Sequence, residues 1–329
     1  MSSRRVRLVH EYFHPWPNSA GFYWARSRGW YADAGIDLEF VLADPGIGDG
    51  LEYVNRGRAE FAVFPSSRLF QRRDLGQPLV AFAAVNQCGL ETVRTVRSTG
   101  ITRLRDLAGR SVGLNPTPRG IAIIRDLVAR DGGNPNDVRL VDLGARELTA
   151  YDIEAGEVDA TYGSYWAWDN LRDDYPANEQ LVWNVDEHLG VGYHSYLLGT
   201  RDDQLAEDRD FVDRFRAVTA RGFEAAAADP GEVAALYERV TPYFSRSLID
   251  ASARLASTTW LHRGRWGALR PELLAPYAAW MADHGLVGDR QIWLDAVSRS
   301  SLDEFEPLGD NEPTDRQPSR VSALRALAS

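Results

Sequence analysis

Between residues 5 and 200, short apolar segments typical of strands alternate with amphipathic segments typical of helices. The strand-like segments include IDLEFVLA, AEFAVF and PLVAFAAVN, followed further along by SVGLN and VDATYGSY. Strands that alternate with helices at this spacing form parallel sheets with helices on both faces. At 329 residues the chain is long enough for two such lobes. We therefore predict an α/β fold in which each lobe is a mostly parallel sheet flanked by helices.

Prolines and polar side chains set the first element boundaries. Residues 5–13 alternate as a half-buried strand would, and Pro15 and Pro17 prevent that strand from continuing. Asn18 or Ser19 is then expected to cap a helix through its side-chain oxygen.

The later part of the chain has a different character. A helix is predicted from Trp166, and residues 193–200 are interpreted as a strand that returns to the first lobe. Residues 202–296 are mainly helical in pattern, which predicts a helical C-terminal extension. Residues 301–329 are polar and contain several prolines, so we expect a loose tail there.

Composition excludes several classes of function. A net charge of −10 disfavours nucleic-acid binding, and no apolar run is long enough for membrane insertion. The chain contains no lysine, which excludes Schiff-base chemistry with pyridoxal phosphate and the lysine of a phosphate-binding P-loop. No cofactor is expected. Cys88, the single cysteine, is interpreted as a small buried residue.

The first residues, MSSRRVRLVHEYF, contain arginines but no apolar stretch and no cleavage site of a secretory signal. We expect a cytoplasmic protein from the sequence as written. If an export segment was removed, the protein would instead be periplasmic or extracellular, so the localisation stays open.

Residues 10–14, His-Glu-Tyr-Phe-His, match the H-E-x-x-H pattern of zinc peptidases. That pattern binds zinc only on a helix, where residues four apart share one face. On the strand predicted here, His10 and His14 would lie about 13 Å apart, which is too far for one zinc ion. No metal site is predicted.

Four loops that follow predicted strands carry the candidate binding residues, because ligands of open α/β sheets bind at the carboxyl ends of strands. Their aromatic faces, hydroxyls, amides and guanidinium groups suit a flat ring with polar substituents. The candidates are Trp16 and Asn18, then Phe64, Ser66, Ser67 and Arg68, then Asn115, Thr117 and Arg119, then Tyr162, Ser164 and Trp166, and finally Tyr193 and His194. Each also has an ordinary structural explanation: Ser66 would serve as a helix cap, and Arg119 as a surface charge.

The sequence resembles a family of periplasmic substrate-binding proteins for thiamine-pyrimidine precursors, alkanesulfonates and taurine. The segments that carry the resemblance include HPWPNSAGFYW, AGIDLEF, AEFAVFPSSR, DLAGRSVGLN and EAGEVDATYGSYW. The resemblance implies a two-lobe type II periplasmic-binding-protein fold, with residues 1–92 plus 191–300 in one lobe and residues 93–190 in the other. It also implies a ligand in the cleft between the lobes and an ABC transporter permease as partner.

Two enzyme branches share that fold. Pyrimidine precursor synthases of the eukaryotic type use a pyridoxal-phosphate lysine and a nearby histidine, where this sequence has Phe64 and Arg68. Aryl-sulfinate desulfinases carry a nucleophilic cysteine in a Cys-Pro-x-Pro-Asn segment, which here reads His14-Pro15-Trp16-Pro17-Asn18. An imidazole therefore replaces the nucleophile, and it is able to act as a base or as a ligand contact.

Two functions remain open from the sequence. The first is a substrate-binding protein that captures a small, flat, polar organic ligand for import, either a pyrimidine thiamine precursor or a related aromatic or sulfonate compound. The alternative is a cytoplasmic enzyme on the same fold, a desulfinase-like or other lyase or hydrolase acting on an aromatic substrate, with His14 in the nucleophile position. The lack of a convincing catalytic set favours binding.

Overall fold

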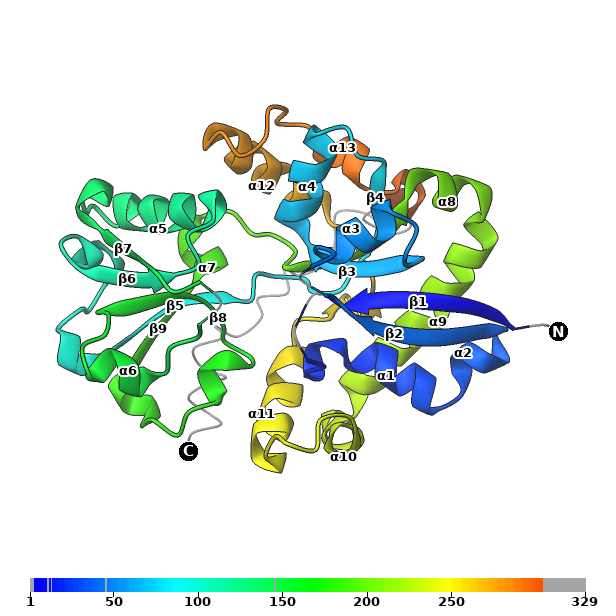
Figure 1. Ribbon diagram of the computed structural model, residues 1–329, viewed down its shortest axis with the longest axis horizontal. Coiled ribbons are helices and arrows are strands. Elements are labelled where there is room, and N and C mark those ends of the chain that lie inside the picture. Colours follow the sequence, from blue (N-terminus) through cyan, green and yellow to red (C-terminus); the bar gives the residue numbers. More distant parts are fainter. Residues whose placement is uncertain (1–2, 11, 13, 45, 145, 304–329) are drawn as a thin grey trace. The chain divides into compact units, whose positions relative to one another are not determined.

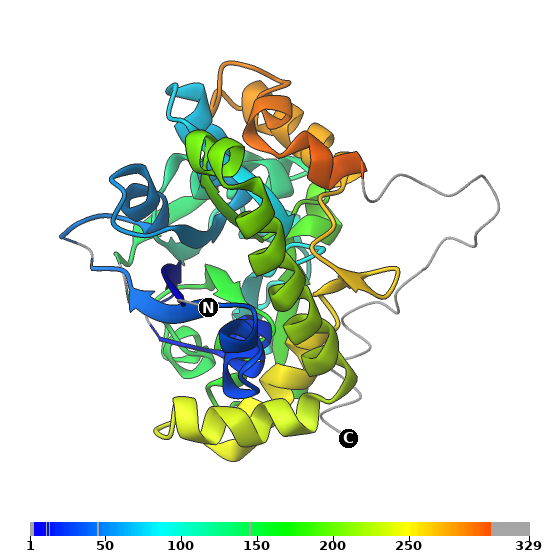
Figure 2. The same cartoon turned by 90° about the vertical axis from the view of Figure 1, so that its right-hand side faces the viewer.

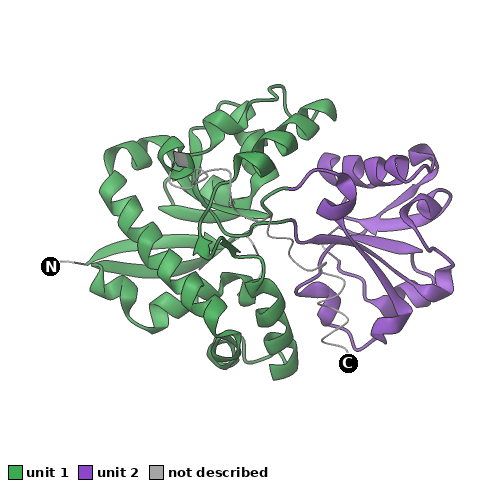
Figure 3. Cartoon of the chain, turned by 180° about the vertical axis from the view of Figure 1, so that it is seen from behind, with its two compact units in different colours: residues 1–88, 193–306 green, residues 89–192, 307–329 purple. Residues whose placement is uncertain are grey.

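A computed structural model of the chain describes residues 3–10, 12, 14–44, 46–144 and 146–303 (Figure 1, Figure 2). The described residues form two compact units (Figure 3). Unit 1 holds the described residues up to Cys88 and those from Tyr193 onward, and unit 2 holds residues 89–192. Each unit has a five-stranded sheet flanked by helices, which confirms the predicted α/β fold.

The sheet of unit 1 has the strand order β2-β1-β3-β10-β4. Its strands are β1 (Arg4–His10), β2 (Ile36–Leu42), β3 (Phe61–Pro65), β4 (Leu79–Ala84) and β10 (Tyr196–Arg201). β1 runs parallel to β2 and β3, whereas β10 runs antiparallel to β3 and β4. The sheet is therefore mostly parallel, and the segment predicted to return to the first lobe forms its antiparallel strand.

Helices cover both faces of this sheet. Those before β4 are η1 (Pro17–Ser19), α1 (Ala20–Ser27), α2 (Trp30–Asp33), α3 (Gly50–Asn55) and α4 (Ser66–Asp74). In Figure 1, α3 and α4 lie on one side of the sheet, and α1 and α2 lie on the other. Val6 and Leu8 of β1 are fully buried, as their alternation with arginines predicts.

The sheet of unit 2 repeats this pattern, with the strand order β7-β6-β8-β5-β9. Its strands are β5 (Glu91–Val96), β6 (Ser111–Leu114), β7 (Arg139–Asp142), β8 (Ala160–Tyr165) and β9 (Gln180–Asn184). β6 is parallel to β7 and β8, and β5 is antiparallel to β8 and β9. The helices are α5 (Pro118–Arg130), α6 (Ala150–Glu154) and α7 (Val185–Leu189), with the 3-10 turns η2 (Arg97–Thr99), η3 (Leu104–Leu107), η4 (Pro135–Asp137), η5 (Asp169–Leu171) and η6 (Ala177–Glu179).

Most of the chain after β10 is helical, as predicted, and belongs to unit 1. The helices are α8 (Asp202–Glu207), α9 (Arg209–Ala228), α10 (Pro230–Val240), α11 (Arg246–Ser257), α12 (Pro271–Asp283), α13 (Trp293–Ala296) and α14 (Arg299–Asp303), with a hairpin of β11 (Leu261–His262) and β12 (Arg265–Trp266) before α12. Of the predicted tail, residues 304–329 lie outside the described residues. No helix in the described part of the chain has both the length and the apolar character needed to cross a membrane.

Two glycines allow α9 to lie directly against α1, and Figure 2 shows these helices side by side. A Cβ atom on Gly222 would lie 2.2 Å from the carbonyl oxygen of Gly21, and one on Gly21 would lie 2.1 Å from the ring of Phe223. That ring stacks on Trp266, with 4.8 Å between the ring centroids. The position of α1, and of the loop before it, therefore depends on two residues that have no side chain.

The predicted helix from Trp166 is wrong. β8 leads instead into a turn and the short η5, because the carboxylate of Asp169 accepts a hydrogen bond from the backbone N–H of Tyr165 at 2.8 Å. A side chain that bonds the backbone four residues earlier offers the chain a local alternative to the helix.

Ser19 occupies the N-cap position of α1, as predicted, but the expected capping hydrogen bond is not formed. Neither side chain makes a capping hydrogen bond at the start of η1 or α1. The Ser19 hydroxyl donates back to the carbonyl oxygen of Trp16 at 2.9 Å, and the Asn18 amide bonds to residues distant in the sequence.

We expect Gly222→Ala to lower the free energy of unfolding by about 1–3 kcal/mol, because its methyl group would overlap the Gly21 carbonyl and force α1 and α9 apart. Urea unfolding followed by circular dichroism measures the change. Gly231→Ala in α10 is the matched control, because a Cβ there meets only Asp229 at 3.6 Å, an ordinary contact. Equal losses in the two variants would contradict the packing argument.

Candidate ligand-binding site

Unit 1 has a small pocket at the carboxyl end of β1. Its described walls come from this strand end, the loop that follows, α1, β3 and β10, namely His10, Tyr12, His14, Pro15, Trp16, Asn18, Ser19, Phe22, Val63, Val85 and Tyr196. The cavity volume is about 20 Å³, which is the space of about one water molecule. The predicted Trp16 and Asn18 therefore lie together with His14, in walls that are aromatic and polar.

The buried amide of Asn18 is held by hydrogen bonds on both of its ends. Asn18 Nδ2 donates to Asn86 Oδ1 at 3.2 Å, and Asn86 Nδ2 donates to Asn18 Oδ1 at 2.6 Å. Asn18 Oδ1 also accepts from the indole nitrogen of Trp260 at 3.1 Å, and Asn86 Nδ2 donates to Thr259 Oγ1 at 2.8 Å. An amide nitrogen has two hydrogens, and the described residues bind one of those on Asn18. The other is able to donate into the pocket.

The loop that carries Trp16 is held by a hydrogen bond from α10. The carbonyl oxygen of Trp16 accepts hydrogen bonds from the Ser19 hydroxyl at 2.9 Å and from the Tyr237 hydroxyl at 2.8 Å. The two hydroxyl oxygens lie 2.8 Å apart, and each uses its single hydrogen for the Trp16 carbonyl. The backbone of the pocket wall is therefore fixed before any ligand arrives.

His10 is a buried, uncharged polar group beside this pocket. Its ring lies against the aromatic rings of Phe22, Tyr23 and Phe40, at centroid distances of 5.4, 6.0 and 5.3 Å. Burial lowers the pKa of His10 from 6.5 to about 4, so the imidazole is neutral at pH 7. Within the described chain its Nε2 atom has no hydrogen-bond partner, which marks this position as one where a polar ligand atom or a water would be favourable.

His14, the alternative catalytic residue, is half-buried among aromatic rings. Tyr12 meets its ring edge-on at a centroid distance of 5.0 Å, and Phe244 lies at 4.9 Å. Tyr243, which is largely exposed, lies at 6.5 Å. These contacts place the imidazole at the pocket wall, where it is able to touch a ligand.

Tyr193, His194 and Ser66 hold the frame of unit 1. Both ring nitrogens of the buried His194 are bonded: Nδ1 donates to the carbonyl of Asn86 at 2.7 Å, and Nε2 accepts from the backbone N–H of Arg270 at 3.0 Å. The Ser66 hydroxyl donates to the His194 carbonyl at 2.6 Å, and Tyr193 is buried with its ring stacked on that of Tyr277. These hydrogen bonds and this stacking favour structural roles over the predicted ligand contacts.

The remaining predicted residues of the second loop are either buried or part of an ion pair. Phe64 is fully buried on β3, and Ser67 is buried in the first turn of α4. The guanidinium of Arg68 lies 3.4 Å from the carboxylate of Asp49, which it shares with Arg72.

At the corresponding edge of unit 2, Arg119 and Tyr162 contact the carboxylate of Glu91, which is not among the predicted residues. The Arg119 guanidinium donates to both oxygens of Glu91, at 2.7 and 2.6 Å. The Tyr162 hydroxyl lies 3.2 Å from Arg119 and 3.3 Å from Glu91. The rule of post-strand loops misses Glu91, because this residue begins an antiparallel strand.

The other predicted residues of unit 2 lie around this group in different environments. Thr117 caps α5 by accepting from the backbone N–H of Gly120 at 3.1 Å, and Asn115 is exposed in the loop before it. The carbonyl of Ser164 accepts from the Thr92 hydroxyl. Trp166 is buried, and its indole nitrogen is 3.4 Å from the Gly89 carbonyl.

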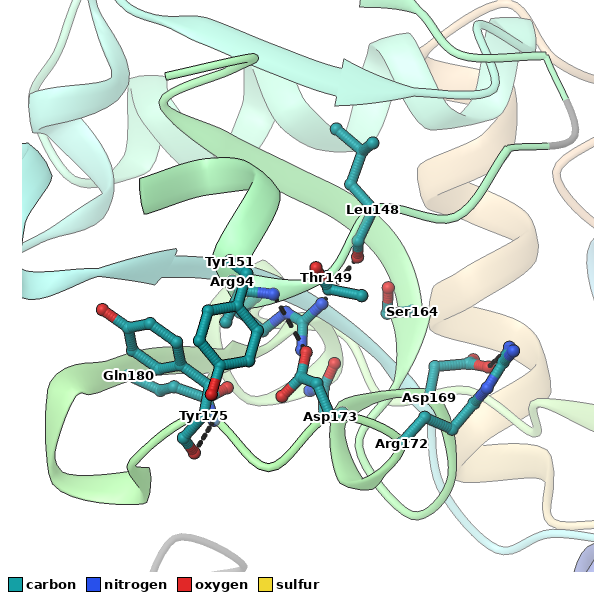
Figure 4. Close-up of polar contacts among 12 residues, drawn as sticks. Arg94, Leu148, Thr149, Tyr151, Ser164, Asp169, Arg172, Asp173, Tyr175 and Gln180 are labelled. Atoms are coloured by element: carbon teal, nitrogen blue, oxygen red, sulfur yellow. Dashed lines mark hydrogen bonds and ion pairs between the residues drawn. The ribbon is translucent and has the colours of Figure 1, made fainter. Parts of the chain in front are cut away.

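A buried ion pair holds the segment that follows β8. The Arg94 guanidinium donates to the Asp173 carboxylate at 3.0 Å and to the Leu148 carbonyl at 2.7 Å (Figure 4). Asp173 also accepts from the backbone N–H of Ala150 at 2.9 Å. The two charged side chains are only 2% and 6% exposed, so each depends on the other for compensation.

No metal centre is formed by the part of the chain that the structure describes: it contains no group of three or more His, Cys, Asp or Glu able to hold an ion. His10 ends a strand, as the argument against the H-E-x-x-H pattern requires. Cys88 is buried, as predicted.

We expect Arg94→Met to lower the free energy of unfolding by about 3–5 kcal/mol, because it leaves the Asp173 carboxylate buried without its cation. Chemical denaturation checks the loss. Arg103→Met is the control in the same unit: it breaks an exposed pair with Asp131 and should cost at most about 1 kcal/mol. Losses of similar size in the two variants would contradict the argument that the buried pair contributes more to stability than the exposed pair.

We also expect stability to fall below pH 6.5 because of His10 and His194. Burial lowers the pKa of each from 6.5 to about 4, so between these values the unfolded chain binds protons that the native structure does not. Each histidine should therefore remove about 1 kcal/mol per pH unit as the pH falls from about 6 to 5. Urea unfolding measured at each pH gives the slope. His194→Gln should reduce this slope, whereas His188→Gln, on an exposed histidine, should not.

Comparison with known proteins identifies a family and solved structures that are similar to this chain. The family model described as NMT1/THI5 like matches residues 16–233. A formylaminopyrimidine-binding protein of Halalkalibacterium halodurans is 24% identical over 215 residues, which cover 64% of this chain and 63% of that protein. The match thus spans less than two thirds of that relative.

Solved structures share the fold at low sequence identity. The periplasmic aliphatic sulphonate binding protein SsuA from Escherichia coli matches with a TM-score of 0.68 and 13% identity, over 96% of this chain and 99% of that one. The desulfurization enzyme DSZB matches with a TM-score of 0.61 and 15% identity, over 91% and 99%. The predicted periplasmic-binding-protein fold is thereby confirmed, and the chain belongs to the NMT1/THI5-like family.

Proposed function

We propose that this protein is a substrate-binding protein that captures a small, flat, polar organic ligand for import through an ABC transporter. The observation that carries the proposal is the pocket of unit 1, where Trp16 and Asn18 meet the neutral His10 at the carboxyl end of β1. Membership of the family, and a relative that is a formylaminopyrimidine-binding protein, support it. In this proposal the protein works outside the cytoplasmic membrane beside a permease.

The chemistry of the pocket suits a heteroaromatic ring. Tyr12 and Trp16 offer aromatic faces, the Asn18 amide offers an N–H donor, and the His10 imidazole offers a neutral hydrogen-bonding nitrogen. A cavity of about 20 Å³ does not hold a whole ring, so we propose that the ligand also contacts residues outside these walls. That the ligand lies between two lobes remains a prediction from the sequence.

A thermal-shift screen followed by calorimetry tests the proposal. The compounds are formylaminopyrimidine, other aminopyrimidines, methanesulfonate and biphenyl-2-sulfinate. A true ligand at 100 times its Kd should stabilise the fold by about 2.7 kcal/mol. If the folded protein is stabilised by none of them, the proposed ligand class is wrong.

Tyr12→Ala is expected to weaken binding of a flat ligand by about 1–3 kcal/mol, because it removes an aromatic face from the pocket wall. Calorimetric titration of both proteins measures the change. Tyr151→Ala, which truncates an exposed tyrosine of unit 2, is the control and should bind as the wild type does. Unchanged affinity in Tyr12→Ala would mean that the ligand does not stack there.

The enzyme alternative has one specific observation in its favour: His14 lines the same pocket, in a fold that the desulfurization enzyme DSZB shares. Incubation with biphenyl-2-sulfinate and detection of released sulfite tests it. Turnover that disappears in His14→Ala would replace the pure binding function by catalysis.

A further inference from the structure

Glu91 and Arg119 form a paired charge at the ligand-facing edge predicted for unit 2. The two guanidinium nitrogens and the two carboxylate oxygens face each other at 2.7 and 2.6 Å, a bidentate geometry. Their side chains are only 15% and 16% exposed. The Tyr162 hydroxyl lies within 3.3 Å of both, so three polar groups with donors and acceptors share one place.

Three elements of unit 2 bring this group together. Arg119 lies in the first turn of α5, directly after β6, and Tyr162 lies on the parallel strand β8. Glu91 begins the antiparallel strand β5 and pairs with Tyr165 at the carboxyl end of β8. Gly120 allows the Tyr162 ring to approach α5, because a Cβ there would lie 3.1 Å from it.

An anion at this edge would meet an occupied guanidinium. It would either lie close to the Glu91 carboxylate and be repelled, or displace that carboxylate and leave it unpaired in a mostly buried position. An uncharged ligand with N–H donors meets no such penalty, since the carboxylate accepts hydrogen bonds while it stays paired with Arg119.

The candidate residues of unit 1 also provide no positive charge that lacks a nearby carboxylate. Arg68, the other arginine among the candidate residues, lies 3.4 Å from the Asp49 carboxylate, which also binds Arg72 at 3.0 Å. The described walls of the pocket contain no arginine, and the sequence contains no lysine. His10 is neutral at pH 7. Among the described candidate residues of both edges, each permanent positive charge thus has a carboxylate partner.

We propose that Glu91 is a specificity-determining residue, which makes this protein select uncharged ligands with N–H donors, such as aminopyrimidines, over sulfonates and other anions. The Glu91 carboxylate accepts from a ligand N–H while it stays paired with Arg119. The inference rests on the proposed function, because Glu91 affects the choice of ligand only where the edge of unit 2 takes part in binding.

Calorimetric titration of the full chain with an uncharged aminopyrimidine and with methanesulfonate tests the inference. The wild type should bind the aminopyrimidine at least about 100-fold more tightly. Glu91→Gln keeps the shape and leaves Arg119 uncompensated, so it should weaken the aminopyrimidine about 10-fold and strengthen methanesulfonate about 10-fold. In Glu91→Gln/Arg119→Gln the gain for methanesulfonate should disappear.

Asp131→Asn is the matched control, because it removes one carboxylate of the same unit that pairs with Arg103 at the surface. Both affinities should stay within about twofold. The inference is overturned if a folded Glu91→Gln changes neither affinity. It is equally overturned if the wild type prefers methanesulfonate, a measurement that needs no variant to fold. If the wild type binds no compound of either class, the proposed function fails, and the inference fails with it.

Discussion

The reciprocal hydrogen bonds between the buried amides of Asn18 and Asn86 are the contact on which the candidate site depends. A buried amide is costly unless its polar atoms are bonded, so the two side chains fix each other's position. Through Trp260 and Thr259 the same pair binds the chain after α11, and the Asn86 carbonyl binds His194 before β10. Segments from the start, middle and end of unit 1 must therefore come together before the pocket wall exists.

Charge compensation is the second constraint, and it follows from a chain whose only permanent cations besides its terminus are arginines. A guanidinium binds a carboxylate through two parallel hydrogen bonds, which a lysine ammonium does not do. Unit 2 uses such pairing for two purposes. Arg94 and Asp173 are buried and hold the segment after β8, whereas Arg119 and Glu91 lie at the sheet edge. The same chemistry stabilises the frame in one place and sets the charge of the candidate site in the other.

Much of the fold was predictable, because strand and helix periodicity are local properties of the sequence. The site was predictable only in part. Trp16 and Asn18 follow a strand and lie at the pocket, as the rule of strand ends predicts. Glu91 was missed because its place depends on strand pairing, and the helix from Trp166 failed because Asp169 bonds the backbone of Tyr165. Non-local pairing and local side-chain bonds do not appear in periodicity.

The hydrogen bonds that anchor the loop after β1 lie beside the pocket position that carries His14. The hydrogen bonds of Ser19 and Tyr237 hold the carbonyl of Trp16, and those of Asn86 hold Asn18. These anchors begin at residue 16, whereas residue 14 precedes them and lies at the pocket wall. A substitution at residue 14 therefore changes the chemistry that faces a ligand and leaves the anchors in place. Here residue 14 is an imidazole that lies among aromatic rings.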